Sequence, residues 1–276
     1  KLRKLRHLCA HPEFESNYEL YTTDRDTTRA CLRSMLEGIL IKSPLITKNI
    51  FIDFLQDISD NKDMLTNDNT LHRYLDSKYF KHLSSDLMNN FFRSLWKLVF
   101  RTENKECNNN RFINYKSLVH LFSKKEDKFK DIIKKEVDYY SNINFYKYMI
   151  YFLSFYPKVY KLLNDTAKPL IDEKINSDFN FILISWFNKS DLKEHLNYVK
   201  KVFDKKSEES FTNRNPRIDG EYFNHLWDIC VSNGLKEEFI NLCIHFYGAS
   251  NCYNDANIIF EVAINPYINE FEKDDL

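Results

Sequence analysis

Apolar residues return at one helical spacing through the C-terminal half of the chain. The clearest case occupies positions i, i+3, i+4, i+7 and i+8, with Phe223, Leu226, Trp227, Cys230 and Val231. The same offsets start at Tyr115, Tyr146 and Phe179. Such offsets place apolar side chains on one face of a helix. The successive starts are 31, 33 and 44 residues apart, which lies within the range of about 20 to 50 residues that is typical of helical repeats.

Each of these helices is followed by a polar break and a second amphipathic segment. Gly234 predicts a left-handed helix stop, after which Phe239 begins the same apolar spacing. Pro157 suits the first turn of another second helix. Two second helices open in the same register with related tripeptides, Leu192-Lys193-Glu194 and Leu235-Lys236-Glu237. A helical hairpin repeated about four times predicts an all-α fold, an α-solenoid of stacked hairpins. An irregular helical domain is the alternative.

The spacing also predicts how the chain is divided. Residues 1–110 form an N-terminal helical region of irregular hairpins, with loops near 60–70 and 101–111. Residues 111–264 hold the repeats, with an inserted loop at 204–219 that explains the 44-residue interval. Residues 265–276 form an acidic end. No segment alternates with a period of two residues for long enough to predict a sheet.

Composition narrows the class of protein. Four glycines are too few for a glycine-rich phosphate loop or a β-fold with many tight turns, so a nucleotide-binding α/β fold is not expected. The formal net charge is zero, so contact with nucleic acid would depend on local patches. The six cysteines include no CxxC pair, which favours reduced thiols and a non-secretory compartment. No apolar run is long enough to predict a membrane span.

At its repeats the sequence resembles the pentatricopeptide-repeat family. The match is carried by Glu221-Tyr222-Phe223-Asn224-His225-Leu226-Trp227 and Asn233-Gly234-Leu235-Lys236-Glu237-Glu238, and more weakly by Ser177-Asp178-Phe179-Asn180-Phe181-Ile182. The resemblance is fair over about 176–247, weak over 111–163 and only architectural before that. It departs from the family at Leu196 and Phe239, where a small residue is usual. Such degenerate repeats occur in fungal mitochondrial members and in those that became ribosomal subunits.

The resemblance implies positions for RNA contact. In this family each repeat reads one base with a polar residue of its first helix and another at the end of the repeat. Asn180 and Asn224 stand at the first-helix position, and Asp219 could complete a pair with Asn180. Lys116 and Lys147 occupy the equivalent place in the earlier units. A second interpretation is that these asparagines cap or link helices.

Two basic stretches differ in their surroundings. The acid-free start of the chain supplies Lys1, Arg3, Lys4 and Arg6 as candidates for contact with RNA phosphates or with an acidic partner. This stretch resembles the remnant of a processed organellar transit sequence, and a truncated start is an equal alternative. The lysines of 124–135 alternate with acidic residues, which favours a solvated helix face.

Metal binding and catalysis lack supporting motifs. Neither the set Cys230, Cys243, His245 and Cys252 nor the set His7, Cys9 and His11 has the paired spacing of a zinc site. No HExxH, GxSxG or Walker sequence is present. We therefore expect a protein without catalytic residues, metal or cofactor.

These inferences lead to one principal hypothesis and two rivals. The first is a non-enzymatic helical-repeat scaffold of mitochondrial translation in the matrix, a small-subunit component of the mitochondrial ribosome that contacts ribosomal proteins and rRNA. The second is an RNA-binding factor that activates translation of a mitochondrial transcript or matures it. The third is a helical adaptor between proteins in another compartment. The zero net charge favours the first over a free RNA reader.

Overall fold

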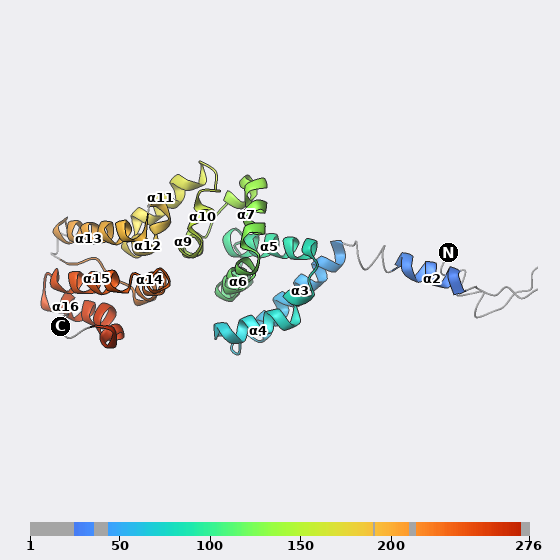
Figure 1. The fold of residues 1–276 in the computed structure, drawn as a ribbon, viewed down its shortest axis with the longest axis horizontal. Helices are drawn as coiled ribbons and strands as arrows, with labels where there is room; N and C mark the ends of the chain where they lie inside the picture. Colours follow the sequence, from blue (N-terminus) through green and yellow to red (C-terminus); the bar gives the residue numbers. More distant parts are fainter. Residues whose placement is uncertain (1–24, 36–43, 190, 210–213, 272–276) are drawn as a thin grey trace, which may run out of the picture. The chain divides into compact units, whose positions relative to one another are not determined.

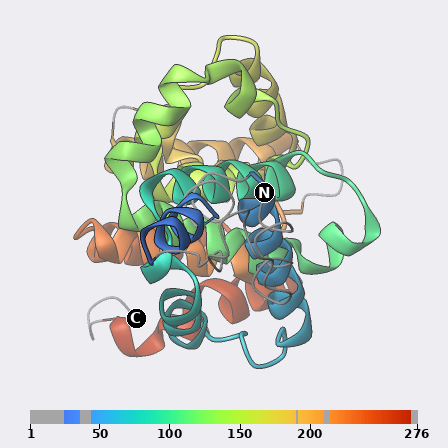
Figure 2. The same ribbon diagram turned by 90° about the vertical axis from the view of Figure 1, so that its right-hand side faces the viewer.

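The computed structural model describes residues 25–35, 44–189, 191–209 and 214–271. These residues form helices joined by short connections, with no strand among them, so the predicted all-α class is confirmed (Figure 1 and Figure 2). The chain separates into two compact units, one of 1–61 and 83–91 and the other of 62–82 and 92–276. Helix α6 spans Lys105–Lys124. The predicted domain boundary at 110 therefore falls within it, and of the predicted loop at 101–111 only 101–104 lie outside a helix.

The smaller unit contains α2 (Arg25–Met35), α3 (Pro44–Asp60) and the first turns of α5 (Ser85–Phe100). Proline fixes its own φ near the helical value and lacks the N–H that would be unpaired there, which explains why α3 begins at Pro44. Its aromatic core joins Phe51 and Phe54 to Phe91, with ring centroids 4.9 and 5.1 Å from Phe91.

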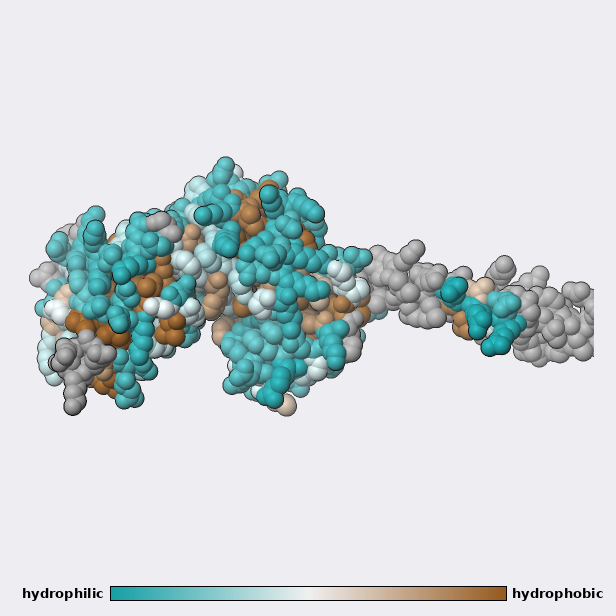
Figure 3. Space-filling model, in the orientation of Figure 1, coloured by the Kyte–Doolittle hydropathy of each residue, from teal (hydrophilic) through white to brown (hydrophobic). Residues whose placement is uncertain are grey.

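The larger unit holds the rest of α5 and the remaining helices. In chain order these are α4 (Asp68–Lys78), η2 (Phe80–His82), α6, α7 (Glu126–Lys135), α8 (Val137–Ser141), α9 (Tyr146–Phe155), α10 (Pro157–Tyr160), α11 (Ala167–Ser177), α12 (Phe179–Ile184), η3 (Trp186–Asn188), α13 (Leu192–Glu209), α14 (Gly220–Ser232), α15 (Lys236–Gly248), α16 (Tyr253–Ile259), η4 (Phe260–Ile264) and η5 (Asn265–Glu270). None of the helices in the described part of the chain has the length and apolar character to cross a bilayer. Polar side chains cover much of the visible surface of this unit, with hydrophobic areas between them (Figure 3).

The predicted apolar faces form the core of the larger unit. Phe223, Leu226, Cys230 and Phe239 are fully buried, whereas Val231 is 47% exposed. Tyr247, at the same i+8 place in α15, is 45% exposed. The i+8 position lies about 80° around the helix from the first residue of the stripe, so it falls at the edge of the buried face. The prediction that Val231 and Tyr247 share that face was wrong.

Helices α12 to α15 form two hairpins, and each helix of the first hairpin contacts the corresponding helix of the second. Helix α12 packs against α14, and α13 packs against α15. Gly234 has a φ of 72°, and the N–H of Leu235 donates to the carbonyl of Cys230. This is the left-handed helix stop that the sequence predicts between α14 and α15.

The inserted loop at 204–219 is shorter than predicted. Helix α13 continues to Glu209: Phe203 is fully buried, and Ser207, one turn later, is also buried and donates to the carbonyl of Phe203 at 2.9 Å. The later part of the segment is bound to the rest of the unit: Asn215 donates to the carbonyl of Ala249 at 2.9 Å and to Asp255 at 3.0 Å, and Ile218 is buried.

The predicted acidic end also begins later. Residues 265–270 form the helical turn η5. Tyr267 is buried against Phe223, Trp227 and Phe239, with ring centroids 6.1, 5.1 and 5.1 Å away. Aromatic burial therefore adds these residues to the core of the larger unit.

Candidate functional site

The residue after the first member of each apolar stripe is polar in all four predicted repeats: Lys116, Lys147, Asn180 and Asn224. These are the positions at which the resemblance implies base reading. In the structure each of them contacts a different segment of the larger unit, so we describe them together as the first-helix polar positions.

Asn180 joins α12 to the segment that precedes α14. Its Oδ1 accepts from the N–H of Asp219 at 2.8 Å, and its Nδ2 donates to the carbonyl of Arg217 at 3.2 Å. The Asp219 side chain accepts from the N–H of Glu221 at 2.9 Å and caps α14. Asn180 and Asp219 are in contact through the backbone of Asp219, and both the oxygen and the nitrogen of the Asn180 side chain have partners within the larger unit.

The other three positions are also engaged. Asn224 accepts from the hydroxyl of Tyr267. Lys116 pairs with Asp68 of α4 at 2.6 Å, and Lys147 pairs with Glu221 at 3.2 Å. The interpretation that these residues link helices is directly supported by these contacts. The basic candidates Lys1, Arg3, Lys4 and Arg6 lie outside the described residues.

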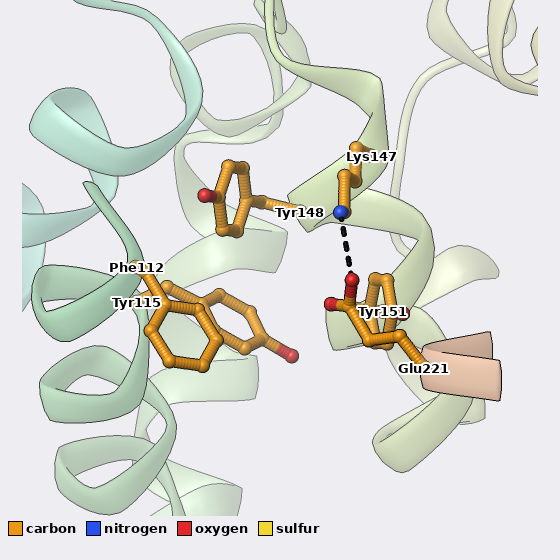
Figure 4. A pocket seen from close by; sticks show the side chains of 6 residues that line it. All are labelled: Phe112, Tyr115, Lys147, Tyr148, Tyr151 and Glu221. Atoms are coloured by element: carbon orange, nitrogen blue, oxygen red, sulfur yellow. Dashed lines mark hydrogen bonds and ion pairs between the residues drawn. The ribbon is translucent and has the colours of Figure 1, made fainter. Parts of the chain in front are cut away.

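Lys147 and Glu221 lie at a cavity of about 350 Å³ between α6, α9 and α14 (Figure 4). Four aromatic side chains supply most of its lining: Phe112, Tyr115, Tyr148 and Tyr151. Tyr115 is 7% exposed, and its hydroxyl points from α6 toward Tyr151 and Glu221. That hydroxyl has no hydrogen-bond partner within the described part of the chain.

Burial keeps the tyrosines of this cavity neutral. It raises the pKa of Tyr115 well above its ordinary value, with smaller contributions from Tyr156 and Tyr148. Burial is also the main cause of the raised pKa of Tyr151, followed by the negative charge of Glu221. At physiological pH these side chains therefore offer neutral hydroxyl groups and ring faces.

A buried histidine and serine lie beside the cavity. The hydroxyl of Ser154 donates to the carbonyl of Tyr151 at 2.7 Å, so Nε2 of His225 supplies the proton in the contact between Ser154 and His225. Ser154 is 1% exposed and lies within α9. Because a substrate cannot reach this hydroxyl without opening the core, we assign the pair to linking α9 and α14.

Cys230, Cys243, His245 and Cys252 do not assemble a metal site. Burial raises the pKa of Cys230 to about 12 and raises that of Cys243 further, so both remain thiols. His245 instead contacts Asp204 at 2.9 Å, and Cys252 is exposed. No group of three metal-ligating side chains occurs in the part of the chain that the structure describes. His7, Cys9 and His11 lie outside it.

The cavity was not predicted from the sequence. Its walls come from helices that begin at Lys105, Tyr146 and Gly220, and no local pattern connects residues so far apart. Of its lining residues, the sequence singled out Lys147 as the equivalent of Asn180 and Asn224, Tyr115 as the start of an apolar stripe and Glu221 as part of the family resemblance. Comparison with protein-family models, with curated proteins and with solved structures finds no match.

Proposed function

We propose that this chain is a non-enzymatic helical-repeat scaffold, and that its hairpins stack as an α-solenoid. The observation that carries the proposal is the engagement of the first-helix polar positions. Each of Lys116, Lys147, Asn180 and Asn224 contacts another helix or connection of the larger unit. The side chains of Asn180 and Asn224 are held by hydrogen bonds to the larger unit and are not free to pair with the edge of a base, so these contacts favour a scaffold over a base-reading protein.

The packing of the last two hairpins supports the stacked arrangement. First helix contacts first helix in α12 and α14, and second helix contacts second helix in α13 and α15. Helix α9 also contacts α12, which extends the row of first helices by one member. A row of this kind shares one core between neighbours and offers an extended surface to partners.

The specific form of the proposal follows from the resemblance to pentatricopeptide repeats. We propose a small-subunit component of the mitochondrial ribosome, in the matrix, that contacts ribosomal proteins and rRNA. The zero net charge of the chain suits a protein held mainly by protein surfaces, because free RNA-binding proteins gain much of their affinity from phosphate contacts.

Sedimentation of a tagged chain in mitochondrial extract tests this form. We expect stoichiometric co-migration with the small ribosomal subunit through a wash at high salt, which weakens contacts held by exposed charge. Release by the wash, or migration as free protein, contradicts the ribosomal form. Location in the cytosol would favour the adaptor.

Substitution of the asparagines tests the scaffold against the RNA reader. Asn180→Ala removes a link that is buried in part, and we expect a loss of about 1 to 2 kcal/mol of unfolding free energy. Affinity for single-stranded RNA should not change. Asn224→Ala is the matched variant at the next repeat. Sequence-selective RNA binding that both substitutions abolish, without a change in unfolding free energy, contradicts the scaffold.

A further inference from the structure

The cavity between α6, α9 and α14 has the features of a cation-binding cage. Four aromatic side chains line it, and Glu221 places a carboxylate beside them. The faces of aromatic rings carry partial negative charge and attract ammonium and guanidinium groups. A volume of about 350 Å³ is roughly ten times the share of one water molecule in the liquid, which leaves room for the end of a long side chain.

A cation already lies at the edge of this cage. The ammonium of Lys147 is 3.2 Å from Glu221 and lies 5.9 and 5.4 Å from the ring centroids of Tyr151 and Tyr222. Its side chain is 43% exposed, so it can leave for water at low cost. Exposed pairs of this type are worth only about 0.2 to 1 kcal/mol. A better-fitting cation can therefore displace it.

The charges near the cage favour a cation over a phosphate. The negative charges of Glu221 and Asp219 both act on the phenols of Tyr151 and Tyr222, and Asp178 also acts on Tyr222. Lys147 and Arg111 are the cations that act on Tyr148. Arg111 is buried and donates to the carbonyls of Val99 and Thr102, so its charge is already compensated inside the core.

The buried hydroxyl of Tyr115 is an unused hydrogen-bonding group in the wall. It is aimed at the space between α6 and α14 (Figure 4), and no partner for it occurs among the described residues. Leaving such a group unpaired costs about 1 to 3 kcal/mol. This oxygen is fully buried, so a ligand in the cavity meets the ring of Tyr115 and not its hydroxyl.

We propose that this cavity binds the guanidinium group of an arginine on a partner protein, against the aromatic side chains that line it and beside Glu221. A guanidinium is planar, stacks on aromatic faces and has five N–H donors, so one group can contact the rings and donate to Glu221. A lysine ammonium lacks this planar geometry. The inference extends the proposed scaffold function by naming a side chain of the partner.

The test uses the whole purified chain and small probes. N-acetyl-arginine amide is titrated by NMR, with the isosteric but uncharged N-acetyl-citrulline amide as the matched ligand. We expect millimolar binding of the arginine probe, with changes at the amides of Tyr115, Tyr151 and Glu221, and no binding of the citrulline probe. Equal binding of the two probes, or no binding of arginine at millimolar concentration, overturns the proposal.

The affinity of three variants for the arginine probe tests which side chains contribute to binding. Glu221→Gln keeps the shape and removes the charge, and we expect about a tenfold loss of affinity, as for a charge-assisted hydrogen bond. Tyr115→Phe removes only the buried hydroxyl, which the ligand does not reach, and should leave the affinity unchanged. Lys147→Met removes the competing ammonium and should strengthen binding about threefold. Thermal unfolding of each variant checks that the fold is retained.

One control variant and one titration with RNA complete the experiment. Lys193→Met breaks a comparable exposed pair, Lys193 with Glu238 at 2.7 Å, and should leave the affinity unchanged. A single-stranded oligouridylate is titrated in parallel. Binding of this RNA that weakens with Lys147→Met would identify a nucleic-acid site and overturn the arginine site. These measurements use the isolated protein. A negative result for the arginine site would therefore leave the sedimentation test of the ribosomal proposal unaffected.

Discussion

The segment that starts at Tyr146 and the segment that starts at Phe223 share one apolar spacing but fold differently. Helix α14 is followed by α15, a second helix of 13 residues. Helix α9 is followed by α10, which has only 4 residues. The first helices are similar in length, at 13 and 10 residues, so the difference arises after them.

The apolar content of the second segment explains this difference. In α15 the buried side chains continue over more than two turns, with Phe239, Leu242, Cys243 and Phe246. After Pro157 only Val159 and Leu163 are buried before Asn164. The side chain of Asn164 accepts from the N–H of Ala167 at 2.9 Å, at the start of α11. A short apolar stripe therefore gives a short helix and a new helix start, whereas a long stripe completes the hairpin.

The largest expected effect comes from removing the first member of each stripe. Phe223 is fully buried, and Tyr146 is only half-buried. Phe223→Ala should lower the unfolding free energy by about 3 to 5 kcal/mol because it leaves a cavity among rings. Tyr146→Ala should cost about 1 kcal/mol. Urea denaturation followed by circular dichroism measures both, and equal losses would contradict the difference between the two regions.

Acid should weaken the region of α13 and α14. Burial lowers the pKa of His195 and of His225 from 6.5 to about 4. Both histidines are neutral in the folded and the unfolded chain above pH 6.5, so the free energy of unfolding does not depend on their titration there. Between pH 6.5 and 4 the unfolded chain takes up protons first, and stability falls by about 3 kcal/mol for each histidine.

Denaturation in urea between pH 7 and 4 measures this loss. His195 donates from Nε2 to the carbonyl of Leu183 at 3.1 Å, and its Nδ1 has no partner in the residues that the structure describes. His195→Gln does not titrate and should show a shallower fall with acid. A variant with the same pH dependence as the original chain would refute the assignment.

The smallest effect concerns the turn that completes the last hairpin. Gly234 has a positive φ, a conformation that side chains with a Cβ rarely adopt. Gly234→Ala should cost about 1 kcal/mol. Gly248→Ala is the matched control, because Gly248 lies in α15 with nothing within 4 Å of a Cβ placed there. The control should be neutral or stabilising, and a larger loss in the control would contradict the role of Gly234.

The sequence predicted those features that depend on neighbours along the chain. The spacing identified α14 and α15, Gly234 identified their turn, and Pro157 identified the start of α10. It did not predict that α12 ends at Ile184 and gives way to a tighter turn. The tighter turn changes the direction in which the following side chains point. As a result Phe187 is buried, whereas Trp186 is only partly buried.

Contacts between residues far apart in the chain could not be predicted from the sequence. Asn180 was singled out by its position, but its partners Arg217 and Asp219 depend on how two hairpins meet. The cavity combines Tyr115, Tyr151 and Glu221, which share no spacing. Helical periodicity specifies which face of a helix is apolar, and it does not specify which other helix that face will meet.

Tyr267 has a consequence for the end of the larger unit. Its ring contacts Phe223, Trp227 and Phe239, and its hydroxyl donates to Asn224. One side chain of η5 therefore fastens the last described turn to both α14 and α15. Proteolytic removal of this turn would expose apolar rings of two helices at once and favour association with other chains.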